Sequence, residues 1–289
     1  MRLAYLGSPA AAVPPLRALL AEGHDIRIVV TQPDRRRGRG AGLVPTPVKA
    51  AALEAGLTVT DRVDDVLEAG VELGIVVAYG RLIKPHVLEQ VPMINLHFSL
   101  LPRWRGAAPV ERAILAGDTE TGVCVMALEE GLDTGPVYRR EVVTIGADET
   151  AEELRSRLVE VGTVLLVEAL RDGLGEPEAQ QGEPTYAAKL DVEEAHLDWE
   201  RPAVELHRLV RIGRAWTTFR DHRLRVLRAK LHDGEAQAPP AGVIDGLVVG
   251  TGDGLGLELV GVQPEGKPPM PAAAWQNGAR PHPGERLGQ

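Results

Sequence analysis

The sequence predicts an α/β fold in which a Rossmann-like, mostly parallel sheet is followed by a small, OB-like β-barrel. Strand-like and helix-like segments alternate from the N-terminus, beginning with strand, helix and strand within about thirty residues. From Arg220 onward, short strands separated by Gly-containing turns replace this alternation. We therefore expect two domains, at 1–190 and 200–289.

The elements of the first domain follow from hydrophobic periodicity and from the breakers between them. The continuous apolar run at 73–78 is typical of a strand buried on both faces of a parallel sheet. The turn after the first strand lacks the Gly-x-Gly-x-x-Gly pattern, so we do not expect a dinucleotide cofactor. We expect strands at 2–7, 26–30, 73–78, 93–98, 119–128 and 137–145, and helices at 14–20, 47–57, 84–90, 109–115 and 150–172.

The second domain is expected to begin after a polar, Gly- and Pro-containing segment at 174–200, which we interpret as a linker. A helix at 203–210 precedes the short strands. Asp245 and Gly246 separate two short apolar runs, which is a strong hairpin signal. Successive hairpins in about eighty residues favour the small antiparallel barrel.

Composition excludes several classes of protein. The chain has 289 residues, 44% of them hydrophobic, and no apolar run reaches the roughly 18 residues that a membrane span needs. A breaker at Pro9 comes too early for a signal peptide. The single Cys124 cannot form an internal disulfide, and we expect it to be a buried thiol in an apolar strand. We therefore expect a cytoplasmic protein without a membrane partner.

Two polar side chains end one of the predicted strands. Asn95 and His97 alternate with apolar residues, so both point to the same face, and Pro102 and Gly106 then break the strand. Open α/β sheets bind ligands at such strand ends. An amide can donate a hydrogen bond to a developing oxyanion, and an imidazole beside it can donate or move a proton. The pair therefore suits a reaction in which an oxyanion forms and a proton is transferred. The alternative is structural, with the Asn capping the loop and the His bound to backbone.

The stretch from Asn95 to Pro109 resembles a family signature. Its Asn-x-His-x-Ser-Leu-Leu-Pro run and the Arg-Gly-Ala-Ala-Pro that follows are similar to those of the methionyl-tRNA formyltransferases. The first part is shared by the wider group that uses formyl-tetrahydrofolate. In that group an Asp in a Gly-Leu-Asp-Thr-Gly loop completes the site, and here that residue is Asp133, which alone would be a simple turn former. The resemblance implies catalytic roles for Asn95, His97 and Asp133, and folate contacts for Ser99, Leu100, Leu101 and Pro102.

Basic residues gather in two places, although the formal net charge is −9. The Gly- and Pro-rich loop at 31–49 carries four arginines, and 201–230 holds nine Lys or Arg against two acidic residues. Either cluster could be a solvated surface, because Arg outnumbers Lys 27 to 5. The resemblance implies that the loop reaches the acceptor end of a tRNA, and we expect Arg35 and Arg39 to contact it.

The expected activity is transfer of the formyl group of 10-formyltetrahydrofolate to the α-amino group of methionyl initiator tRNA, a step of translation initiation. Asn95 and His97 would stabilise the oxyanion while Asp133 orients His97. No metal is expected, because the eight histidines show no ligand spacing. We expect a monomer. Two alternatives remain: a sugar-nucleotide formyltransferase, which would not need a basic second domain, and a non-catalytic RNA-binding protein, which would not need the three-residue site.

Overall fold

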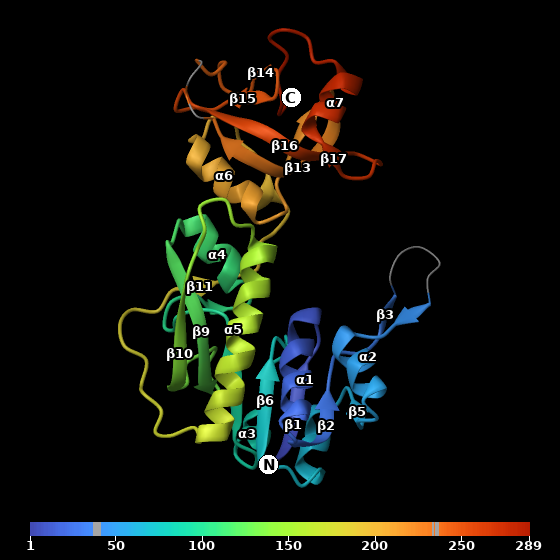
Figure 1. Ribbon diagram of the computed structural model, residues 1–289, viewed down its shortest axis with the longest axis vertical. Helices are drawn as coiled ribbons and strands as arrows, with labels where there is room; N and C mark the ends of the chain where they lie inside the picture. The colour runs from blue at the N-terminus through green and yellow to red at the C-terminus, as the bar shows by residue number, and fades with distance from the viewer. Residues whose placement is uncertain (37–41, 233, 235–236) are drawn as a thin grey trace. The chain divides into compact units, whose positions relative to one another are not determined.

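The computed structural model describes residues 1–36, 42–232, 234 and 237–289, and these form two compact units (Figure 1). Along the described chain, no helix is both long and apolar enough to cross a bilayer. The first unit comprises Met1–Val110, Glu120–Thr144 and Arg155–Ala188, and the second comprises Glu111–Thr119, Ile145–Leu154 and Lys189–Gln289.

The first unit is built on a seven-stranded sheet with the order β10-β9-β7-β6-β1-β2-β5. The five strands from β7 to β5 in this order run parallel, whereas β9 is antiparallel to both of its neighbours. The predicted mostly parallel α/β sheet is thereby confirmed. The strands are β1 (Arg2–Gly7), β2 (Asp25–Val30), β5 (Val59–Thr60), β6 (Leu73–Val77), β7 (Met93–His97), β9 (Glu120–Ala127) and β10 (Val137–Thr144).

Local sequence signals explain where several helices begin and end. The Thr46 side chain caps α2 by accepting a hydrogen bond from the Lys49 N–H, with Pro47 in the first turn. The predicted capping box of α5 is present, since Thr150 and Glu153 exchange side-chain to backbone hydrogen bonds. The helices of residues 1–172 are α1 (Val13–Ala21), α2 (Pro47–Glu54), α3 (Pro85–Leu88), α4 (Pro109–Ala116) and α5 (Ala151–Asp172).

Helix α5 determines which face of β7 is left for the site. A side-chain atom added at Gly162 of α5 would lie 3.0 to 3.3 Å from Val123 and Leu96, so the helix packs directly on β9 and β7. Leu96 is 2% exposed. Because side chains alternate along a strand, Asn95 and His97 point to the face opposite α5.

The second unit is built on an antiparallel sheet with the order β12-β13-β16-β15-β14, and β17 also pairs with β16. The predicted hairpin is confirmed: Ile244 pairs with Val249, and Gly246 takes the positive φ of +59° that the turn needs. Closure of this sheet into an OB-like barrel stays a prediction. The elements are α6 (Ala203–Arg211), β12 (Trp216–Phe219), β13 (His222–Leu231), β14 (Ile244–Asp245), β15 (Val248–Gly250), β16 (Gly256–Pro264), β17 (Met270–Pro271) and α7 (Ala272–Ala279).

The interpretation of 174–200 as a linker is wrong for its middle part. Glu178 forms an antiparallel bridge with Val137, and β11 (Tyr186–Ala187) pairs in parallel with β8 (Arg105–Gly106). These are backbone hydrogen bonds, which residues of any side-chain type can make. The composition of the segment therefore carried no sign of them.

Candidate active site

The predicted site lies at the end of β7, the last of the parallel strands. β7 pairs with β6 on one side and with the antiparallel β9 on the other, and the chain leaving β9 carries Asp133. Asn95 is half-buried and His97 is 5% exposed. The sheet order therefore places two polar residues of β7 beside the loop that follows its neighbour.

Asp133 meets both residues of β7. Its Oδ1 lies 3.5 Å from Asn95 Nδ2, and its Oδ2 lies 3.6 Å from His97 Nδ1. The Gly106 N–H donates a hydrogen bond of 2.8 Å to the same Oδ2. Asp133 is 9% exposed and takes a φ of +51°, a conformation that side-chain-bearing residues seldom adopt. The structure thus brings together the three residues that the sequence singled out.

A backbone contact of Nε2 fixes the orientation of the His97 ring. Nε2 lies 3.0 Å from the Trp104 carbonyl oxygen. A carbonyl only accepts hydrogen bonds, so Nε2 carries a hydrogen and donates it. Nδ1, on the side of Asp133, is then the nitrogen that can take up or release a proton.

The four residues predicted to contact folate have mixed surroundings. Ser99 is fully buried, and its hydroxyl donates to the Arg103 carbonyl at 2.6 Å, which holds the following turn. Leu101 packs into a core cluster with Cys124, whose thiol pKa is raised by burial. Leu100 and Pro102 are half-buried. Ser99 and Leu101 therefore support the loop and the core, and folate contact by this set remains a prediction.

The two arginines predicted to contact tRNA come from the 31–49 segment. Arg35 is exposed on the short strand β3 (Arg35–Arg36), which pairs with β4 (Leu43–Val44). Arg39 lies outside the residues that the structure describes. Lys49 anchors the base of this hairpin through a 2.9 Å ion pair with Asp34. Both arginines remain predictions as tRNA contacts.

Many arginines of the basic segment 201–230 bind other groups of the second unit. Arg211 is 8% exposed and donates to the carbonyls of Glu149 and Gly146, both at 2.8 Å. Arg228 is paired with Glu153, and Arg220 with Glu285. Part of the local positive charge is therefore used to hold the fold.

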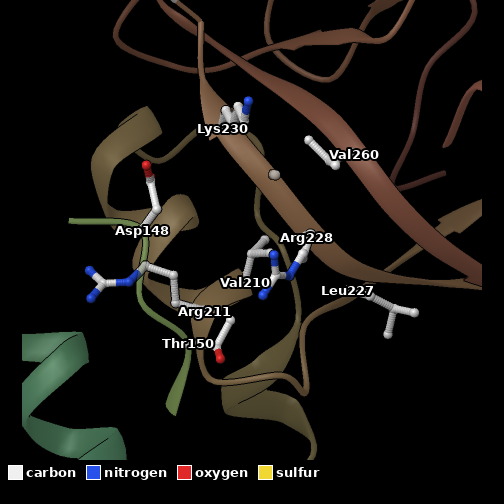
Figure 2. Close-up of a pocket in the computed structure, with 9 residues that line it drawn as sticks. Asp148, Thr150, Val210, Arg211, Leu227, Arg228, Lys230 and Val260 are labelled. Atoms are coloured by element: carbon white, nitrogen blue, oxygen red, sulfur yellow. The ribbon is translucent and has the colours of Figure 1, made fainter. Parts of the chain in front are cut away.

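A shallow pocket of the second unit is lined in part by residues of this basic segment (Figure 2). Asp148 on its wall also lies 3.2 Å from the Nε2 of His207, whose pKa is lowered mainly by burial. Lys230 is exposed. The pocket is lined by Asp148, Thr150, Val210, Arg211, Leu227, Arg228, Ala229, Lys230 and Val260.

Sequence reasoning missed Gln180, whose side chain binds both loops of the site. Its Nε2 donates to the backbone carbonyl of Asp133 at 2.8 Å, and its Oε1 accepts from Arg105. A glutamine in a polar stretch has no distinguishing pattern, so the sequence held no signal for it. Within the described part of the chain, no group of three or more His, Cys, Asp or Glu could hold a metal ion.

Comparison with known proteins assigns both parts of the chain to one family. Residues 1–170 match the model of the formyl transferase family, and residues 189–280 match that of the formyl transferase C-terminal domain. The methionyl-tRNA formyltransferase of Dinoroseobacter shibae is 45% identical, covering 94% of this chain and 96% of its own length. That of Streptomyces coelicolor is 42% identical over the whole of both chains.

Two solved structures share the fold at low sequence identity. The N-formyltransferase of Helicobacter canadensis, in complex with folinic acid and dTDP-3-aminofucose, is 16% identical with a TM-score of 0.70, covering 89% of this chain and 98% of its own. The methionyl-tRNA formyltransferase of Clostridium thermocellum is 16% identical with a TM-score of 0.62, covering 81% and 95%. From the family models and the full-length relatives, the chain belongs to the formyl transferase family and, within it, to the methionyl-tRNA formyltransferases.

Proposed function

We propose that this chain transfers the formyl group of 10-formyltetrahydrofolate to the α-amino group of methionyl initiator tRNA. The observation that carries the proposal is the convergence of Asn95, His97 and Asp133. The Asp133 carboxylate oxygens lie 3.5 Å from Asn95 Nδ2 and 3.6 Å from His97 Nδ1. Relatives named methionyl-tRNA formyltransferase at 42 to 45% identity support the choice of substrate. The proposal includes a monomeric enzyme that acts in the cytoplasm.

The first chemical step is attack by the amine on the formyl carbon. An α-amino group has a reference pKa of about 7.7–8.0, so a usable fraction is neutral at physiological pH. Attack places negative charge on the formyl oxygen. Asn95 Nδ2 has two hydrogens, of which one points toward Asp133 Oδ1, and the other is left to donate to that oxygen.

The second step moves one proton from the attacking nitrogen, by way of a base of the site, to the leaving folate nitrogen. The attacking nitrogen becomes cationic and loses its proton to Asp133 or, through water, to His97 Nδ1. The bond from the formyl carbon to the folate nitrogen then breaks, and that nitrogen takes a proton. The Trp104 carbonyl fixes Nε2 of His97 as a donor, so of the two ring nitrogens only Nδ1 can receive this proton and return it to the folate nitrogen.

The folate donor is proposed to lie against the loop that follows β7. The Helicobacter canadensis N-formyltransferase was solved with folinic acid, which supports a folate derivative as donor. In this proposal Ser99, Leu100, Leu101 and Pro102 shape the folate pocket, Leu101 through its backbone because its side chain packs in the core. Ser99 does so indirectly, because its hydroxyl is bound to the Arg103 carbonyl.

The tRNA is proposed to contact both domains. Catalysis belongs to 1–190, with Arg35 and Arg39 at the acceptor end of the tRNA. The 200–289 domain, whose sheet we predict to close as an OB-like barrel, would bind phosphates. Its contacts rest on exposed cations such as Lys230, because several arginines of 201–230 already bind protein groups.

The decisive experiment supplies purified protein with a labelled formyl donor and charged initiator tRNA. We expect formyl-methionyl-tRNA, no product from a dTDP-linked amino sugar, and loss of product in Asp133→Ala. Formylation of the amino sugar in preference to the tRNA would favour the sugar-nucleotide alternative. Tight, salt-sensitive tRNA binding without any formyl transfer would favour the non-catalytic one.

A further inference from the structure

The segment 178–187, here called the strap, runs along both loops that carry the proposed site. At one end, Val137 and Glu178 exchange two backbone hydrogen bonds of 2.8 Å. At the other end, the Thr185 carbonyl accepts from the Arg105 N–H at 2.9 Å, and the Thr185 hydroxyl accepts from the Trp104 N–H at 2.9 Å. The strap therefore joins the chain after Asp133 to the loop after β7.

The Gln180 side chain makes the connection between the two loops inside this strap. Its Nε2 donates to the carbonyls of Asp133 and Gly135, both at 2.8 Å. Its Oε1 accepts from Nε and Nη2 of Arg105, at 3.0 and 2.6 Å. A guanidinium only donates and a carbonyl only accepts, so this orientation of the amide is the one that satisfies all four contacts.

These contacts hold both Asp133 and the residue that precedes its hydrogen-bond donor. Asp133 has a φ of +51°, and such a backbone conformation costs of order 1–3 kcal/mol unless its surroundings hold it. Gln180 binds the carbonyl of this same residue. Arg105, on its other side, precedes Gly106, whose N–H donates to Asp133 Oδ2. A shift of Gln180 would therefore move both the carboxylate and its hydrogen-bond donor.

We propose that Gln180 is a positioning residue for formyl transfer. It keeps the Asp133 carboxylate hydrogen-bonded to the Gly106 N–H and directed toward Nδ1 of His97. The inference rests on the proposed function of the three-residue site. Gln180 itself is half-buried, and its amide is already used by protein groups, so it makes no contact with the reacting atoms.

The first test measures formylation by Gln180→Ala. We expect kcat to fall about 10- to 100-fold, while the KM values for the folate donor and the tRNA stay within about twofold of wild type. Gln180→Glu keeps the acceptor for Arg105 but has no N–H for the two carbonyls, so it should lose a similar factor. Gln181→Ala is the matched control, because Gln181 is the exposed neighbour, and it should behave as wild type.

A double-mutant cycle separates positioning from a general structural effect. If Gln180 acts through Asp133, adding Gln180→Ala to the Asp133→Ala variant should lower kcat by less than about twofold. The same 10- to 100-fold loss in both backgrounds would overturn the inference, and so would a wild-type kcat in Gln180→Ala. If Gln180→Ala does not fold, the cycle is run with Gln180→Glu. A wild-type protein that forms no formyl-methionyl-tRNA would instead refute the proposed function.

Discussion

Replacing Asp133 by Asn removes one charge from the site with almost no change of shape. The carboxylate lies 3.6 Å from His97 Nδ1. At an effective dielectric constant of about 20, two unit charges at this separation attract by about 4–5 kcal/mol. The Asp133 side chain is 11% exposed, and this partial solvation together with the remaining amide dipole reduces the loss to about 3 kcal/mol. We therefore expect Asp133→Asn to slow the chemical step by about a hundredfold.

Single-turnover kinetics with enzyme in excess over charged initiator tRNA measures this step directly. The Asn side chain can still accept from the Gly106 N–H, which donates at 2.8 Å to the carboxylate, so the loop should keep its conformation. Glu130→Gln is the matched control, since it removes an exposed acidic charge from the same loop and should leave the rate unchanged. A rate for Asp133→Asn within about threefold of wild type would show that the charge does not act on His97.

Three further expectations concern Asn95 of the same site and two residues of the second unit. Asn95→Ala should lower kcat by about 10²–10³, measured by product formation, because it removes a donor to the oxyanion. Lys230→Ala should reduce the salt dependence of tRNA binding by about one counterion in a filter-binding titration, whereas Lys84→Ala should not. Two hydrogen bonds from Arg220 hold the pKa of Glu285 at about 2. Because the unfolded value is higher, about 4.3, this stabilisation is present above that pH and is lost as pH falls toward 2, so Glu285→Gln should flatten the acid side of a stability–pH curve.

The features of the site that could be predicted are those that depend on side-chain type and spacing along the chain. Asn95 and His97 stand two apart on an apolar strand, a pattern that already indicated a shared face and a ligand at the strand end. Asp133 was identified only through the resemblance of its Gly-Leu-Asp-Thr-Gly loop to that of formyltransferases, since the pattern alone indicates a turn. The parallel strands and the hairpin at Gly246 were likewise predicted from periodicity and turn chemistry, and both are confirmed.

The unpredicted part of the site consists of backbone contacts. The Trp104 carbonyl that fixes the His97 ring, and the carbonyls that Gln180 binds, are groups which every residue carries. Ser99 was expected at the folate, yet its hydroxyl is bound to the Arg103 carbonyl. The polar composition of the strap suggested a linker, because the segment has no regular series of apolar residues to pack against a core. Composition gives no information about the hydrogen bonds that a segment makes.

Three features could be predicted from the order of residues: the alternation of strands and helices, the polar pair that ends β7, and membership of a family that moves formyl groups. These depend on short-range spacing, which the order of residues records directly. The folded chain was needed to show that Asp133 contacts Asn95 across 38 positions and that Gln180 contacts Asp133 across 47. Such contacts depend on how the sheet orders β7 beside β9 and on how the strap crosses the loops. Those are sums over many weak interactions, and no local pattern of residues contains them.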